Sequence, residues 1–194
     1  MPREKTFDYE QILEEAMGLF WKKGYHATSM DDLVQSLGLN RSSLYNSFGG
    51  KKELFLKGIK HYQDKNLFRL RQILESESSP KEGLKKLFEF ALKNLCTDKE
   101  KKGCLLVNSS TELIPSEEDV KEFLKENKKK VEELILEFIQ KGIRLKVITN
   151  TKNPKELAEF LFTLYNGIGV VSKLDISTNQ HQFTIKKVME ILGD

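Results

Sequence analysis

Apolar residues recur along this chain with the spacing of α-helices. The first set is Ile12, Leu13, Ala16, Leu19 and Phe20, and the second set is Met30, Leu33, Val34 and Leu37. Steps of three and four residues place each set on one face of a helix. We find no run of alternating polar and apolar residues bounded by turn residues. The pattern therefore predicts an all-α protein.

Residues typical of helix ends divide the N-terminal pattern into short helices. Thr28 or Ser29 is placed to cap the second helix, and Gly38 follows it in a turn where a positive φ is expected. Asn40 is placed to cap a third helix, which Gly49-Gly50 ends. We therefore expect two short helices joined by a glycine-containing turn, inside a three-helix unit of about 50 residues.

A longer helical region follows this unit. We expect a fourth helix from Lys51 to about Glu77, and five more helices after it. Their predicted ranges are 80–95, 104–114, 117–142, 154–171 and 183–192. Ser79-Pro80 and Asn153-Pro154 each join a capping residue to a proline at the first helical position, which favours a helix start. The pattern thus predicts about nine helices.

The composition describes a globular chain of 194 residues with 39% hydrophobic and 31% charged residues. The N-terminus is charged where a signal peptide would be apolar, and the longest uncharged stretch, residues 160–172, is too short to span a bilayer. Cys96 and Cys104 are the two cysteines, so no disulfide framework is expected. We expect a cytoplasmic protein without a membrane partner.

Positive charge is concentrated in one part of the chain. The formal net charge is +3, but residues 40–72 contain eight cations and two anions, a net charge of +6. Lysine-rich stretches are usually solvated helix faces. Here the cations begin at the third predicted helix and continue along the fourth, and this concentration favours a surface that faces phosphates.

The third predicted helix carries the chemistry of DNA recognition. In a helix-turn-helix, the short second helix of the motif enters the major groove with its N-terminal side chains. Arg41 can donate to guanine or to a phosphate, and Asn46 suits adenine. Tyr45 offers a hydroxyl to the sugar-phosphate backbone, and Lys51 can hold a phosphate on the flank. The alternative is an ordinary three-helix packing unit, which has the same pattern.

Two segments, GYHATSMDDL (24–33) and LYNSFGGKKELF (44–55), resemble the N-terminal signature of the TetR family of transcriptional regulators. The resemblance covers about residues 8–60, and Ser47 stands where many members have His. It implies a helix-turn-helix DNA-binding domain at 1–50, joined through the long fourth helix to a ligand-binding and dimerisation domain at 51–194. It also implies DNA contact by Thr28, Asn40, Arg41, Ser42, Ser43, Tyr45, Asn46 and Lys51.

The same resemblance implies a homodimer that binds a palindromic operator on double-stranded DNA and releases it when a small-molecule effector enters the C-terminal domain. Candidate effector contacts are Tyr62, Phe68, Phe88, Leu92, Cys104, Asn108, Phe123, Phe162 and Tyr165; the alternative for each is core packing. Candidate dimer contacts are Phe160, Leu164, Gly167, Val171, Val188 and Leu192. A helix start at Cys104 with lysines nearby would lower its pKa and make it a reactive thiol; the alternative is a buried apolar residue.

The sequence favours no catalytic site, no metal site and no cofactor. His26, His61 and His181 are isolated, and the two cysteines lack the spacing of metal ligands. Two other classes of protein remain open. One is a helical small-molecule carrier or enzyme whose N-terminal unit is only structural, and the other is a ligand-independent DNA-binding activator or architectural protein.

Overall fold

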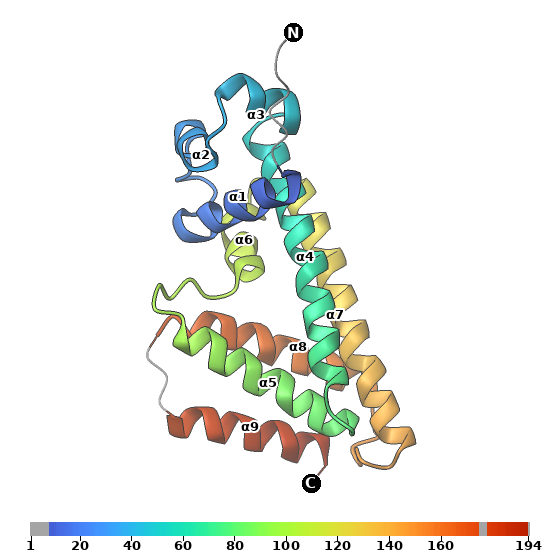
Figure 1. Ribbon diagram of the computed structural model, residues 1–194. Helices are drawn as coiled ribbons and strands as arrows, with labels where there is room; N and C mark the ends of the chain where they lie inside the picture. The colour runs from blue at the N-terminus through green and yellow to red at the C-terminus, as the bar shows by residue number, and fades with distance from the viewer. Residues whose placement is uncertain (1–7, 175–177, 194) are drawn as a thin grey trace.

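The computed structural model describes residues 8–174 and 178–193, and these residues form nine α-helices without a strand (Figure 1). The helices are α1 (Tyr9–Lys23), α2 (Met30–Leu37), α3 (Arg41–Phe48), α4 (Lys51–Glu75), α5 (Pro80–Thr97), α6 (Leu105–Leu113), α7 (Glu118–Arg144), α8 (Pro154–Val171) and α9 (Thr178–Leu192). The all-α prediction is confirmed.

Local capping chemistry sets the ends of the short N-terminal helices. Ser29 caps α2 in a capping box, because its hydroxyl accepts from the Asp32 amide and the Asp32 carboxylate accepts from the Ser29 amide. Gly38 ends α2 in the left-handed region at φ 63°, as predicted. Asn40 caps α3 by accepting from the amide of Ser43 at 2.7 Å. Each of these caps joins residues that are at most three positions apart, so the sequence was sufficient to predict them.

Three other helix ends differ from the prediction by one or more residues. The helix α7 begins after Glu117 rather than after Ser116, and neither residue's side chain caps it. The hydroxyl of Ser116 instead donates a hydrogen bond to the carbonyl of Leu113, the last residue of α6. The helix α4 ends at Glu75, two residues before the predicted end, and α9 begins at Thr178, ahead of Phe183, the first apolar residue assigned to it from the sequence.

The molecule has a small end and a large end, here called the head (α1–α3) and the body (α4–α9). Figure 1 shows α4 and α7 running side by side from the head through the body, with α5, α8 and α9 lying across them and α6 between head and body. The first core joins the head to the start of α4, to α6 and to the start of α7. Side chains on both sides of residue 50 thus share one core, and the domain division there stays a prediction.

The second core fills the body. It is formed by the second half of α4 with α5, α7, α8 and α9. Val188 and Leu192 of α9 are fully buried in it, and burial of such side chains stabilises a fold by about 1.5–3 kcal/mol each. The prediction that these two residues form a dimer interface is wrong, because the chain's own core covers them. No helix among the described residues has the length and apolar character needed to cross a membrane.

Candidate nucleic-acid interface and internal cavity

The outer face of α3 is polar and open to solvent. Leu44 and Phe48 are fully buried and fix the helix against the head. The opposite face therefore presents Arg41, Ser42, Tyr45 and Asn46, all exposed. Ser43 is partly buried, and the side chain of Asn40 is engaged as the helix cap. The sequence predicted this division between the two faces of α3 correctly.

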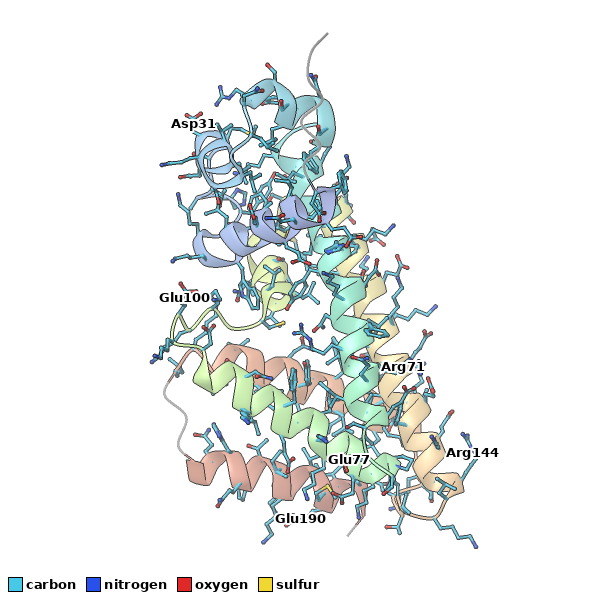
Figure 2. All side chains as sticks on the ribbon, in the orientation of Figure 1. Asp31, Arg71, Glu77, Glu100, Arg144 and Glu190 are labelled. Atoms are coloured by element: carbon cyan, nitrogen blue, oxygen red, sulfur yellow. The ribbon has the colours of Figure 1, made fainter. Side chains whose placement is uncertain are left out.

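Arg41 lies at the N-terminus of α3 beside an acidic residue of α2. Its guanidinium pairs with Asp31 at 3.1 Å, and both side chains are exposed. Figure 2 shows Asp31 on the outer edge of α2, at the end of the molecule opposite to Glu190. Exposed pairs of this kind contribute little to stability, so Arg41 can exchange Asp31 for a phosphate or a base at small cost.

Thr28 does not belong to this exposed face. It is fully buried, and its hydroxyl donates to the carbonyl of Gly24 at 2.6 Å. The prediction of DNA contact by Thr28 is wrong, because its hydroxyl closes the turn between α1 and α2 from the inside.

Lys51 begins α4 next to the turn between α1 and α2. Its ammonium lies 4.4 Å from the centroid of the Tyr25 ring and donates to the carbonyl of His26 at 3.5 Å. Partial burial lowers the pKa of Lys51 below its ordinary value. The cation is thus held near the solvent edge of the head, at a helix N-terminus of the kind that favours anions.

A carboxylate of α6 joins the body to the head. Glu112 accepts hydrogen bonds from the amides of Tyr25 at 3.0 Å and His26 at 2.7 Å, both in the turn after α1. Within the body, Lys52 joins the start of α4 to the start of α7 through ion pairs with Glu117 and Asp119. These partners are separated by more than 60 residues, so spacing along the sequence gave no signal for them.

A cavity of about 400 Å³ lies at the junction of head and body. It is lined by residues of α1 and of α4 to α8 together with the segment before α6. The lining residues are Trp21, Tyr62, Asn66, Arg69, Leu70, Phe90, Ala91, Asn94, Gly103, Cys104, Leu106, Asn127, Val131, Phe162, Tyr165, Asn166 and Gly169. Among the predicted effector contacts, Tyr62, Cys104, Phe162 and Tyr165 lie in this lining.

The other five predicted effector contacts lie elsewhere. Phe68 is 64% exposed on the outside of α4. Phe88 and Leu92 are buried in the second core, and Phe123 packs against the first. Asn108 donates to the carbonyl of Lys102 and accepts from Lys173, beside a separate surface hollow that Glu112 also lines. The spacing of residues along a helix indicates a common face. It does not indicate whether that face borders the cavity, the core or solvent.

The pKa of the Cys104 thiol is raised, so the thiol keeps its proton at neutral pH. Burial raises its pKa above the ordinary value; the amides of Val107 and Leu106 and the charge of Lys173 oppose this effect without outweighing it. The predicted lowering of the pKa is wrong, because the segment after Gly103 turns the sulfur inward instead of leaving it at an open helix end.

Apolar residues on α8 and α9 remain uncovered in the single chain. Phe160, Val171 and Phe183 are 50%, 40% and 59% exposed. Gly167 is exposed on the same helix, with open space where a side chain would lie. Leu164 is partly buried against the second core. Gly169, in contrast, allows a close contact within the chain. A Cβ added at Gly169 would lie 2.9 Å from the Cβ of Cys104, which is too close for a side chain.

Two sequence models of known families match this chain, one over the head and one over the body. The sequence model of the bacterial regulatory proteins of the tetR family matches residues 12–57, and the model of the tetracyclin repressor-like C-terminal domain matches residues 80–188. The second match alone covers more than half of the chain. This chain belongs to the TetR family. It is a helix-turn-helix regulator with a DNA-binding head.

Curated relatives of this TetR-family chain are named as regulators of transcription. The HTH-type transcriptional repressor ComR of Escherichia coli (strain K12) is 31% identical over 193 residues, 98% of this chain and 88% of that protein. The uncharacterized HTH-type transcriptional regulator YezE of Bacillus subtilis (strain 168) is 32% identical over 133 residues, 69% of each chain.

Solved structures of TetR-family proteins resemble this one over nearly the whole chain. A cysteine mutant of the TetR family transcriptional regulator CifR, complexed with double-strand operator DNA, has a TM-score of 0.85 at 26% identity and covers 97% of this chain and 98% of that chain. The reduced form of Escherichia coli NemR has a TM-score of 0.86 at 19% identity and covers 94% and 95%, which shows the fold alone.

The sequence did not reveal several residues of the cavity, among them Trp21, Asn66, Arg69 and Asn127. One signal was present. Tyr62, Asn66 and Arg69 follow one another at steps of four and three, so a polar stripe lies on α4 where an apolar face would be expected. Trp21 carried no such signal, because its contact with the cavity depends on how the head is seated on the body.

Proposed function

We propose that this TetR-family chain is a dimeric repressor that leaves its operator when a small molecule enters the cavity. The observation that carries the proposal is that Trp21, a residue of the head, lines a cavity in the body. Its indole N–H donates to the carbonyl of Gly103 at 3.1 Å. A molecule bound in the cavity therefore touches the unit that holds the DNA-reading helix.

The exposed residues of α3 would read the operator, with Lys51 on a flanking phosphate. Arg41, Ser42, Tyr45 and Asn46 face solvent on one side of α3, and none of them is needed for the core. Bacterial DNA lies in the cytoplasm, which is where we place this activity.

Release of DNA requires the effector to prefer a conformation that binds DNA poorly. A preference of about 1–3 kcal/mol weakens DNA binding by about 5- to 150-fold. The movement would pass through the contacts between α6 and the turn after α1, where Glu112 holds the amides of Tyr25 and His26. These contacts support a route from cavity to head that runs through α6 as well as through α4.

Footprinting on the DNA that flanks the chain's own gene tests the proposal. We expect one protected, near-palindromic site, with an affinity that falls steeply as salt rises because phosphate counterions are released. A carrier or enzyme would protect no specific site. A ligand-independent regulator would protect a site that no cavity ligand releases.

Arg41→Ala refines the assignment of α3. If Arg41 reads a base, the variant should lose preference at one operator position; if it holds a phosphate, binding should weaken on all sequences and the salt slope should fall by about 1. Lys129→Ala is the matched control, because Lys129 is a 75% exposed cation on α7 in the body. Unchanged binding by the Arg41 variant would remove this residue from the interface.

A further inference from the structure

The lining of the cavity contains, among the described residues, one cation and no anion. Among its lining residues, Arg69 of α4 is the one that carries a formal charge at neutral pH, and no carboxylate lines it. Within the described part of the chain, the guanidinium of Arg69 has no acidic partner and no hydrogen bond. Its neighbour Arg71 differs, because it pairs with Glu137 at 2.9 Å on the outside of the body, where Figure 2 labels it.

Two hydroxyls accompany this cation. Tyr62 and Tyr165 line the cavity, and neither hydroxyl has a hydrogen-bond partner among the described residues. Burial raises the pKa of both phenols, while the charge of Arg69 acts on both in the opposite direction. Both hydroxyls therefore stay protonated at neutral pH, and they line the same cavity as Arg69, which gives the cavity three side chains that can donate to an acceptor.

Flat apolar surfaces complete the lining. The indole of Trp21 meets the ring of Tyr62 edge to face with centroids 5.7 Å apart, and Phe90 and Phe162 contribute further rings. The side-chain amides of Asn66 and Asn127 also border the cavity and have no hydrogen-bond partner in the described chain. The volume of about 400 Å³ lies at the small end of the range for small-molecule pockets.

The cavity shares part of its lining, including the cation, with a neighbouring hollow. Trp21, Tyr62, Asn66 and Arg69 also border a second hollow between α1 and α4. The outer rim of that hollow carries Lys65 and His61 beside Glu14, and Lys65 and Glu14 form an ion pair. Arg69 is exposed and lines both hollows, so its guanidinium is accessible to an anion from solvent.

We propose that the effector is a small aromatic monocarboxylate, whose carboxylate binds Arg69 and the hydroxyls of Tyr62 and Tyr165 while its ring lies among Trp21, Phe90 and Phe162. This inference rests on the proposal that the cavity is the effector site. A cationic ligand would find no carboxylate in the lining. A neutral ligand would leave the guanidinium without an anionic partner.

Three probes of nearly identical shape test this charge preference by calorimetry: 4-hydroxybenzoate, 4-hydroxybenzamide and 4-hydroxybenzamidine, with the corresponding 6-hydroxy-2-naphthyl series for a larger ring. The acid should bind about tenfold or more tightly than the amide, and the amidine should not bind. Trp21 is the chain's one tryptophan, so a change in its fluorescence places the probe beside Trp21, and loss of that change in Phe162→Ala, which alters the cavity but not the hollow between α1 and α4, places it in the cavity.

Arg69→Gln should remove the preference for the acid, and Arg71→Gln should keep it, because Arg71 is bound to Glu137 outside the cavity. Both side chains lie at the surface of α4, so both variants should keep their far-ultraviolet circular dichroism. Equal binding of acid and amide, in either ring series, would overturn the inference, as would an unchanged preference in Arg69→Gln.

Release of operator DNA by the same probes separates this inference from the proposed function. If the acid binds through Arg69 and leaves the DNA complex intact, the ligand class stands and the effector role of the cavity fails. If the amide binds as tightly as the acid and releases the DNA, the repressor proposal stands and the ligand class is wrong.

Discussion

At the scale of single residues, burial decides what Cys104 can do. The residue lies before the first turn of α6, and the amides of Leu106 and Val107 face its sulfur, with the charge of Lys173 nearby. These groups favour the thiolate, but removal of the sulfur from water favours the thiol more strongly and raises the pKa. At neutral pH the group is therefore a small apolar residue in the cavity wall with little nucleophilic form.

We expect Cys104 to react slowly with iodoacetamide in the native chain. In a Cys96→Ser variant, which leaves one cysteine, the rate at pH 7.5 should be lower than in the same chain unfolded in urea. The midpoint of the rate against pH should lie above the ordinary thiol value of about 8.5, because burial raises the pKa. Mass spectrometry of the alkylated peptide gives both rates. Native labelling as fast as unfolded labelling would contradict the buried thiol.

What the sequence could show at this scale depends on distance along the chain. The exposed face of α3 was predictable because Asn40, Leu44 and Phe48 define it within one short helix. Thr28 was placed wrongly because its burial depends on how the turn after α1 packs. Among the inward-facing aromatic residues, helical spacing could not separate Phe88, in the core, from Tyr165, on the cavity, because both satisfy the same pattern.

At the scale of elements, α6 is the part that holds head and body together. Its side chains Leu105 and Leu113 are buried in the core of the head, and its Glu112 binds two amides of the turn after α1. The sequence predicted the bounds of α6 to within a residue, because Gly103 and Pro115 flank it. The role of α6 was not predictable, since each of these contacts joins residues far apart in the chain.

We expect Glu112→Ala to loosen this junction. The change leaves the amides of Tyr25 and His26 without their acceptor, and hydrogen bonds to a charged group contribute about 1.5–3 kcal/mol. The free energy of unfolding in urea should fall by about that amount, and the two amides should lose protection in hydrogen exchange measured by NMR.

Glu118→Ala is the control for this variant, because Glu118 is an exposed acid of α7 that pairs with Lys121 on its own helix. It should change the free energy of unfolding by less than about 0.5 kcal/mol. Protection of Tyr25 and His26 that is the same in the Glu112 variant as in the unchanged chain would show that other contacts hold the turn.

At the scale of the whole molecule, five of the exposed apolar residues lie on α8 and α9 or next to them. The helix α8 presents Phe160, Val170, Val171 and Leu174, the last just beyond its end, and α9 adds Phe183. Phe160 and Val171 are 11 residues apart, about three helical turns, so they lie on one stripe along α8, with Val170 and Leu174 at its end. Exposed apolar patches are a feature of interaction sites, and in the dimer that we propose the same stripe of a second copy would cover this one.

Val171→Asp tests this arrangement. If the stripe forms the interface of the proposed dimer, the new carboxylate would be buried between the two chains, so the variant should be monomeric in sedimentation at concentrations where the unchanged chain is dimeric. The two heads would then bind DNA independently, and operator affinity should fall by about 10²-fold or more, because the second head no longer binds at a high effective concentration.

Leu145→Asp is the matched control, since Leu145 is 56% exposed after the end of α7, outside the stripe. It should keep both the dimer and the operator affinity. A monomeric variant with undiminished operator binding would show that one head is sufficient, and a dimeric variant would place the interface on another surface.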